Sequence, residues 1–189
     1  MNLHSKNVLF LGSSVTYGSA AGGVSFADIM AESCGINMIK EAVSGTTLAD
    51  INETSYVSRL KKLDNSVKVD LFICQLSTND AALNLPVAQT ELAIRFIIEY
   101  VKASFDCPVV FYTGTYFESP RYAELVSLLI SLQNEYDFHI LNLWSDAEML
   151  SVSQADYKKY MADTVHPTLY GYREWWTPKF IELCESIQL

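Results

Sequence analysis

The middle of the chain contains the run Asp70-Leu71-Phe72-Ile73-Cys74-Gln75-Leu76, which is apolar at nearly every position. A run of strand length without apolar–polar alternation is typical of a β-strand that is covered on both faces. Such strands occur in parallel sheets, because their crossover helices cover both sides of the sheet. The run therefore predicts a central strand of an α/β fold.

Other apolar runs of strand length lie on both sides of this one, and helix-like segments separate them. The predicted strands are Val8–Leu11, Ile36–Ala42, Val69–Leu76, Pro108–Tyr112 and His139–Leu143. The predicted helices are Ser25–Cys34, Ser55–Leu63, Pro86–Ser104, Pro120–Tyr136 and Leu169–Ile187, the last interrupted near Pro178. This alternation predicts a three-layer α/β/α sandwich around a five-stranded, mainly parallel sheet. We expect residues 1–189 to form one domain, since they contain no linker or repeat.

Two of the predicted helices carry further signals. Ser119 suits the N-cap of a helix whose first residue is Pro120, where the missing N–H has no cost. The helix before it has a wide apolar stripe that must pack against some other part of the protein. The stripe comprises Leu92, Ile94, Phe96, Ile97, Tyr100 and Val101.

The composition is that of a globular protein, with 50% hydrophobic and 19% charged residues among 189. A formal net charge of −9 argues against a nucleic-acid groove or an anionic membrane surface as partner. The first apolar segment is too short for a signal peptide, and no other run reaches membrane-spanning length. The four cysteines are scattered without a CxxC pair, which favours buried free thiols. We therefore expect a cytoplasmic protein.

Small and polar residues follow the ends of the predicted strands. In order along the chain they are Ser14, Gly45, Asn79, Tyr116, and then Asp163 and His166 after the fifth strand. Ligands bind at the carboxyl ends of the strands in open parallel sheets, so these residues are predicted to share one site.

Ser14, His166 and Asp163 are the residue types of an activated oxygen nucleophile. A serine hydroxyl becomes a good nucleophile only when a base removes its proton, and a carboxylate can orient that base. Asp163 stands three residues before His166, close enough for one turn to join them, and Pro167 restricts the histidine to extended backbone. An unperturbed histidine titrates near pH 6.5, so activity is expected to fall on acidification if His166 is the base.

Each of these residues also has a simpler interpretation when it is taken alone. Ser14 could cap a helix, His166 could lie in a surface loop, and Asp163 could be a solvated carboxylate. Gly45 and Asn79 are common in turns. Their combination and order favour the functional interpretation.

Four blocks of sequence match a known family pattern in the right order. They are Gly12-Ser13-Ser14-Val15-Thr16-Tyr17-Gly18 for GDS-x-T-x-G, Gly45 for the second block, Ser77-Thr78-Asn79-Asp80 for GxND, and Asp163-Thr164-Val165-His166-Pro167 for DxxHP, followed by Gly171-Tyr172. Along nearly its whole length the chain resembles the SGNH hydrolases, the GDSL-type esterase/lipase superfamily. The resemblance implies a flavodoxin-like SGNH-hydrolase fold and a serine-dependent ester hydrolase.

The resemblance also implies the roles of individual residues. Ser14 would be the nucleophile, His166 the base and Asp163 the group that orients it. The backbone N–H groups of Ser14 and Gly45 and the side chain of Asn79 would form the oxyanion hole.

Ser13 replaces the usual aspartate of the first block, and Ser77 replaces the usual glycine of the third. Neither is a catalytic group in the family pattern, so these departures bear on local hydrogen bonding and substrate class. Asp80 is expected to be structural. Tyr17, Tyr116 and Glu118 are candidates for substrate binding because they lie in loops after strands.

The predicted enzyme forms an acyl-enzyme intermediate, and its predicted substrates are small carboxylic esters or sugar-acetyl esters. No metal or other cofactor is expected. The sequence contains no cluster of histidines, cysteines and carboxylates at the spacing of metal ligands, and no Gly-rich phosphate loop. The alternatives at the same site are lysophospholipase, thioesterase and acyltransferase activities. A further alternative is that the protein is not an enzyme but a ligand-binding module. The expected partner is a small-molecule ester, without nucleic acid or integral membrane association, and the oligomeric state is left open.

Overall fold

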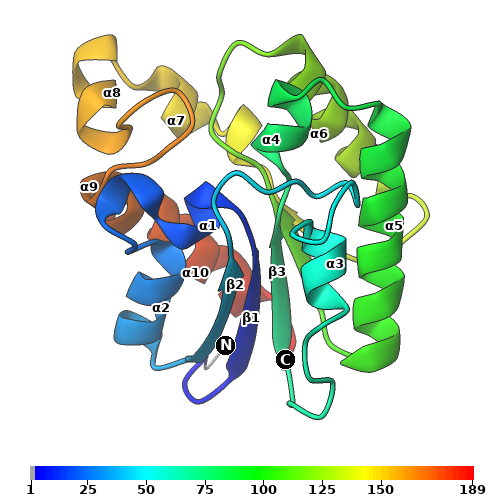
Figure 1. Ribbon diagram of the computed structural model, residues 1–189. Coiled ribbons are helices and arrows are strands. Elements are labelled where there is room, and N and C mark those ends of the chain that lie inside the picture. The colour runs from blue at the N-terminus through cyan, green and yellow to red at the C-terminus, as the bar shows by residue number, and fades with distance from the viewer. Residues whose placement is uncertain (1–2) are drawn as a thin grey trace.

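The computed structural model describes residues 3–189 and has a five-stranded sheet at its centre (Figure 1). All neighbouring strands pair in parallel, in the order β2-β1-β3-β4-β5. The strands are β1 (Asn7–Gly12), β2 (Asn37–Ala42), β3 (Leu71–Gln75), β4 (Val109–Tyr112) and β5 (His139–Leu141). The predicted α/β sandwich with a five-stranded parallel sheet is confirmed, and the apolar run that begins at Asp70 supplies the middle strand.

Helices cover both faces of this sheet. They are α1 (Ser14–Tyr17), α2 (Phe26–Cys34), α3 (Tyr56–Leu60), α4 (Thr78–Ala82), α5 (Val87–Ser104), α6 (Pro120–Leu132), α7 (Ala147–Ser151), α8 (Gln154–Tyr160), α9 (Leu169–Gly171) and α10 (Thr177–Ser186). Short 3-10 turns occur at Ser19–Ala21 and Leu143–Ser145, and a π-helical turn at Tyr172–Trp176. In Figure 1, α2 and α10 lie on one side of the sheet, and α3 and α5 on the other.

The central strand explains why its sequence is apolar without alternation. Phe72 and Cys74 belong to the core beneath α3, α5 and α6. Leu71 and Ile73 point to the opposite core, beneath α2 and α10. Successive side chains of a strand face opposite sides of the sheet, so both sets are buried when both sides are covered.

One position of the predicted apolar stripe on α5 is wrong. Leu92 is 68% exposed and does not belong to the buried stripe of α5, whose core positions include Ile94, Ile97 and Val101. Because 3.6 residues make one turn, a residue two positions before Ile94 points away from the sheet. The N-cap at Ser119 is confirmed, since its side chain accepts a hydrogen bond from the backbone N–H of the third helical residue.

The predicted final helix consists of three consecutive helical segments. Residues 169–186 form α9, the π-helical turn and α10, and Pro178 lies in the first turn of α10. The chain remains helical across this junction, because the Thr177 N–H donates to the Tyr172 carbonyl and both Trp176 and Thr177 have right-handed helical backbone. The expected interruption is therefore a change from π-helical to α-helical geometry just before the proline.

The carboxyl ends of the strands lie at the top of Figure 1, together with α1, α4, α7 and α8. The helices α4, α7 and α8 were not predicted, because each is at most seven residues long and has little apolar periodicity. No helix within residues 3–189 combines the length and the apolar character that crossing a membrane requires.

Candidate active site

Ser14, His166 and Asp163 form one continuous chain of hydrogen bonds. The Ser14 Oγ lies 2.8 Å from the His166 Nε2, and the His166 Nδ1 lies 2.8 Å from the Asp163 Oδ2. An ionised carboxylate only accepts hydrogen bonds, so Nδ1 carries the ring proton and Nε2 accepts from the serine hydroxyl. The fold thus brings the end of the first strand within hydrogen-bonding distance of a turn more than 150 residues later.

The turn that carries the histidine is built by Asp163 itself. Its Oδ1 accepts hydrogen bonds of 2.7 Å from the backbone N–H groups of Val165 and His166. An isolated β-bridge between Met161 and Pro167 closes the turn. The carboxylate therefore fixes the backbone with one oxygen and the imidazole ring with the other.

These contacts also set the ionisation of the acid. Partial burial raises the pKa of the Asp163 carboxyl. The hydrogen bonds from the backbone N–H groups and the interaction with the His166 ring lower this pKa by more, so that it lies below its ordinary value. Asp163 is consequently negative at neutral pH, which is the state that stabilises an imidazolium.

Ser14 begins α1 directly after β1, and polar contacts hold this tight turn. A Cβ on Gly12 would stand 1.7 Å from the Thr16 Oγ1, so only glycine fits at the end of the strand. The Gln75 Oε1 accepts hydrogen bonds from the Ser13 N–H (2.9 Å) and the Thr16 hydroxyl (3.0 Å). The turn is therefore tied to the end of the central strand, and Ser14 itself is buried, with 9% of its surface exposed.

The candidate oxyanion donors come from the ends of three neighbouring strands. Ser14 opens a helix, so its backbone N–H has no partner within that helix. Gly45 has a φ of +79°, and the space that a Cβ would occupy there is empty, so the backbone conformation is what favours glycine. The Asn79 Nδ2 donates to the Thr46 carbonyl (2.8 Å), which leaves its second N–H for another acceptor.

Asp80 anchors the loop after β2 and is fully buried. Its carboxylate accepts hydrogen bonds from the backbone N–H groups of Leu48 (2.8 Å) and Ala49 (2.9 Å) and from the Thr90 hydroxyl (2.9 Å). It therefore holds the segment that carries Gly45 against α4 and α5, which supports the structural role expected for it.

Both departures from the family pattern have local hydrogen-bonding roles. The Ser77 Oγ accepts a hydrogen bond from the Asp80 N–H and caps α4. The Ser13 hydroxyl donates to the Gln75 Oε1 at 3.3 Å. Gln75 was not predicted as part of this region, although a polar residue inside an apolar strand is a signal that could have found it.

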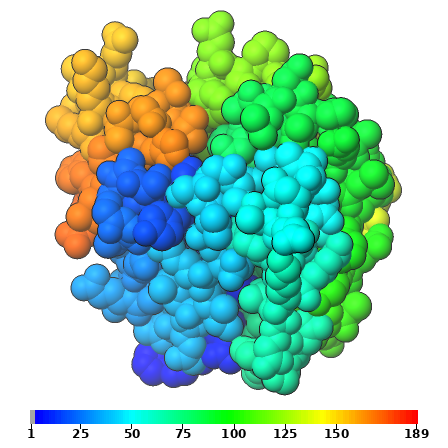
Figure 2. Space-filling model, viewed as in Figure 1, coloured from blue at the N-terminus to red at the C-terminus, as the bar shows by residue number. Residues whose placement is uncertain are grey.

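The candidate substrate-binding residues are all exposed side chains. Tyr17 is 46% exposed and Tyr116 is 52% exposed, and Glu118 is also exposed. Tyr116 packs on Trp144 and borders a cavity of about 130 Å³. Figure 2 shows a notch at the top of the molecule, between the gold and orange segment near residues 150–165 and the green segment near residues 110–120.

The same cavity adjoins the turn that carries the histidine. Thr115 lines it and donates a hydrogen bond from its Oγ1 to the Met161 sulfur at 3.9 Å. Met161 is bridged to Pro167, the residue after His166. Within residues 3–189, no cluster of three or more histidine, cysteine or carboxylate side chains is arranged to hold a metal ion.

Comparison with known proteins identifies the family. The model of the GDSL-like Lipase/Acylhydrolase family matches residues 10–174, and the chain belongs to this family. It is therefore an ester-hydrolysing enzyme that acts on small-molecule esters. No curated protein matches the chain in sequence.

Solved structures share the fold at low sequence identity. A protein from Lactobacillus plantarum has a TM-score of 0.85 at 19% identity, with 98% of this chain and 99% of that chain covered. A member of the lipolytic protein G-D-S-L family from Veillonella parvula has a TM-score of 0.76 at 15% identity, covering 97% and 100%. An acetylxylan esterase from Geobacillus stearothermophilus has a TM-score of 0.71 at 17% identity, covering 96% and 95%.

Proposed function

We propose that the chain hydrolyses small acyl esters through a covalent acyl-enzyme on Ser14. The observation that carries this proposal is the continuous set of contacts from the Ser14 hydroxyl through His166 to Asp163, each 2.8 Å long. The separation of nucleophile and base is within the reach that proton transfer requires.

The reaction follows from the ionisation of these groups. As the Ser14 Oγ attacks the ester carbonyl carbon, its proton passes to the His166 Nε2, and the imidazolium is stabilised by Asp163. The carbonyl oxygen becomes negative and is held by the N–H groups of Ser14, Gly45 and Asn79, each worth about 3 kcal/mol.

Breakdown of this intermediate breaks the bond to the alcohol oxygen, which takes the proton from His166. A water molecule then attacks the acyl-enzyme while His166 removes its proton. The second tetrahedral intermediate releases the carboxylic acid, and the proton returns to the Ser14 oxygen.

Small acyl groups, and acetyl groups on sugars in particular, are the proposed substrates. The exposed rings of Tyr17 and Tyr116 offer flat surfaces for a sugar. An acetylxylan esterase and a family two carbohydrate esterase are among the structures that share the fold.

The test is hydrolysis of p-nitrophenyl esters from acetate to octanoate, and of acetylated xylo-oligosaccharides. We expect kcat/KM to fall as the acyl chain lengthens, and Ser14→Ala to abolish turnover. Ser19→Ala is the matched control, because this exposed serine lies five residues away in the next turn and should leave activity unchanged. Equal rates for wild type and Ser14→Ala would refute the proposal, whereas a preference for octanoate, thioesters or added alcohols would replace the substrate assignment.

We also propose that residues 1–189 act as one domain in a reducing compartment such as the cytoplasm. Segments from both ends of the chain, β1 and α10, belong to the same core, which supports the first statement. All four cysteines are free thiols, which fits the second.

A further inference from the structure

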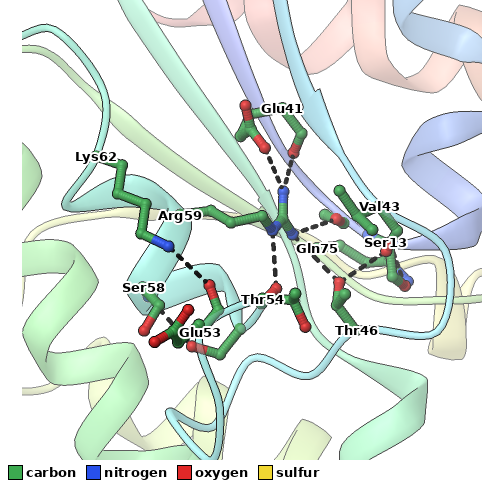
Figure 3. Close-up of polar contacts among 12 residues, drawn as sticks. Ser13, Glu41, Val43, Thr46, Glu53, Thr54, Ser58, Arg59, Lys62 and Gln75 are labelled. Carbon is green, nitrogen blue, oxygen red and sulfur yellow. Dashed lines mark hydrogen bonds and ion pairs between the residues drawn. The ribbon is translucent and has the colours of Figure 1, made fainter.

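Arg59 is a buried cation at the centre of the loops that carry the candidate oxyanion donors (Figure 3). It lies on α3 and is only 8% exposed, although it stands among the apolar residues of a five-residue helix. A buried charge is costly unless it is paired and hydrogen-bonded, so its contacts require an explanation.

The guanidinium donates hydrogen bonds from every nitrogen. Nε donates to the Thr54 carbonyl (2.9 Å), and Nη1 donates to both the carbonyl and the carboxylate of Glu41 (2.9 Å each). Nη2 donates to the Gly12 carbonyl (2.8 Å) and to the Thr46 Oγ1 (3.2 Å). Glu41 supplies the balancing charge at the end of β2.

Two of these acceptors lie next to the proposed oxyanion donors. Gly12 ends β1 two residues before Ser14. Thr46 follows Gly45, and its hydroxyl also donates to the Val43 carbonyl at 2.7 Å. The Nη2 of Arg59 therefore contacts the backbone before Ser14 and the side chain of the residue after Gly45, and so links the two segments that carry these N–H groups.

The third donor depends on the same residue. The Asn79 amide is held by the carbonyl of Thr46, whose side chain Arg59 holds. The guanidinium is planar and always charged, so it fixes its partners at defined angles, which a flexible lysine ammonium cannot reproduce.

On the basis of the proposed function, we propose that Arg59 is a positioning residue: through Gly12 and Thr46 it holds the N–H groups of Ser14, Gly45 and Asn79 in the geometry that binds the developing oxyanion. Oxyanion donors act in the transition state, and a displacement of about 1 Å can cost about 100-fold in rate. Loss of Arg59 should therefore lower kcat and kcat/KM together, with KM nearly unchanged.

The test compares Arg59→Lys and Thr46→Val with wild type in p-nitrophenyl acetate hydrolysis. We expect kcat to fall at least tenfold in both variants, with KM within about threefold. Thr46→Ser keeps the hydroxyl and should restore most of the rate. Arg95→Met is the matched control, because this arginine pairs with Glu91 and Glu135 outside the site and should leave kcat unchanged.

A double-mutant cycle measures the coupling between Arg59 and Asn79 in kcat, which a purely structural role of Arg59 would not produce. If Arg59 acts through the oxyanion donors, the kcat losses of Arg59→Lys and Asn79→Ala are less than additive in the double variant. Fully additive losses, or an Arg59→Lys enzyme with wild-type kcat, would overturn the inference. Ser14→Ala in the same assay separates the two hypotheses, because a fully active Ser14→Ala refutes the proposed function as well.

Discussion

Replacing Asp80 should reveal how strongly the loop after β2 is held. The perturbation is Asp80→Asn, which keeps the size of a fully buried side chain but removes its charge and turns one acceptor into a donor. The native carboxylate accepts three hydrogen bonds, two from the backbone N–H groups of Leu48 and Ala49 and one from Thr90. An amide can keep the pair that shares Oδ2, but its NH2 group then faces the Leu48 N–H.

The magnitude follows from these contacts. A buried donor left without a partner costs about 1–3 kcal/mol, and the remaining bonds weaken because the acceptor is no longer charged. We therefore expect Asp80→Asn to lower the free energy of unfolding by about 2–4 kcal/mol. Thr90→Val removes a single hydroxyl bond and should cost about 1 kcal/mol. Asp80→Ala loses all three bonds and should cost more than either.

The assay is equilibrium urea unfolding at pH 7, followed by tryptophan fluorescence and circular dichroism, with the m-value checked for each variant. Glu124→Gln serves as control, because this carboxylate is 58% exposed in an ion pair within α6 and should change stability by less than about 0.5 kcal/mol. An Asp80→Asn protein within that same margin of wild type would refute the reasoning.

Three further outcomes are expected. Asp163→Asn should lower kcat by a factor of about 10² to 10⁴, because an amide cannot hold the His166 tautomer; steady-state kinetics test this, and an unchanged kcat would contradict it. Gly171→Ala should destabilise the protein, since a Cβ there would stand 1.9 Å from the Tyr160 carbonyl oxygen; a lowered Tm tests this, and a wild-type Tm would show that the backbone yields. The free energy of unfolding should be level above about pH 5 and fall as pH drops below about 4. The reason is that the pKa of Asp28, like that of Asp163, is lowered in the folded state: burial raises it, but a lysine ion pair and hydrogen bonds lower it more. Urea unfolding at several pH values tests this, and stability that does not decline below pH 4 would contradict it.

The sequence alone predicted the sheet and the edge of the sheet at which the candidate site lies. Apolar runs such as that from Asp70 to Leu76 predict buried parallel strands, because a strand with both faces covered needs apolar residues on both. Glycine and polar residues after those runs then predict a site at the carboxyl edge, since all parallel strands end there. These inferences depend only on local periodicity and on a general property of parallel sheets.

Tertiary structure decided which side chains meet and which supporting residues hold them. Arg59 on α3 reaches Gly12 of β1, Glu41 of β2 and Thr46 in the loop after β2, and Asp80 binds that loop more than 30 residues away. No local pattern encodes such contacts, because a buried polar group finds its partners only where the packed elements bring them within hydrogen-bonding distance. The short helices α4, α7 and α8 have the same origin, since so few residues form a stable helix only when the rest of the protein packs against them.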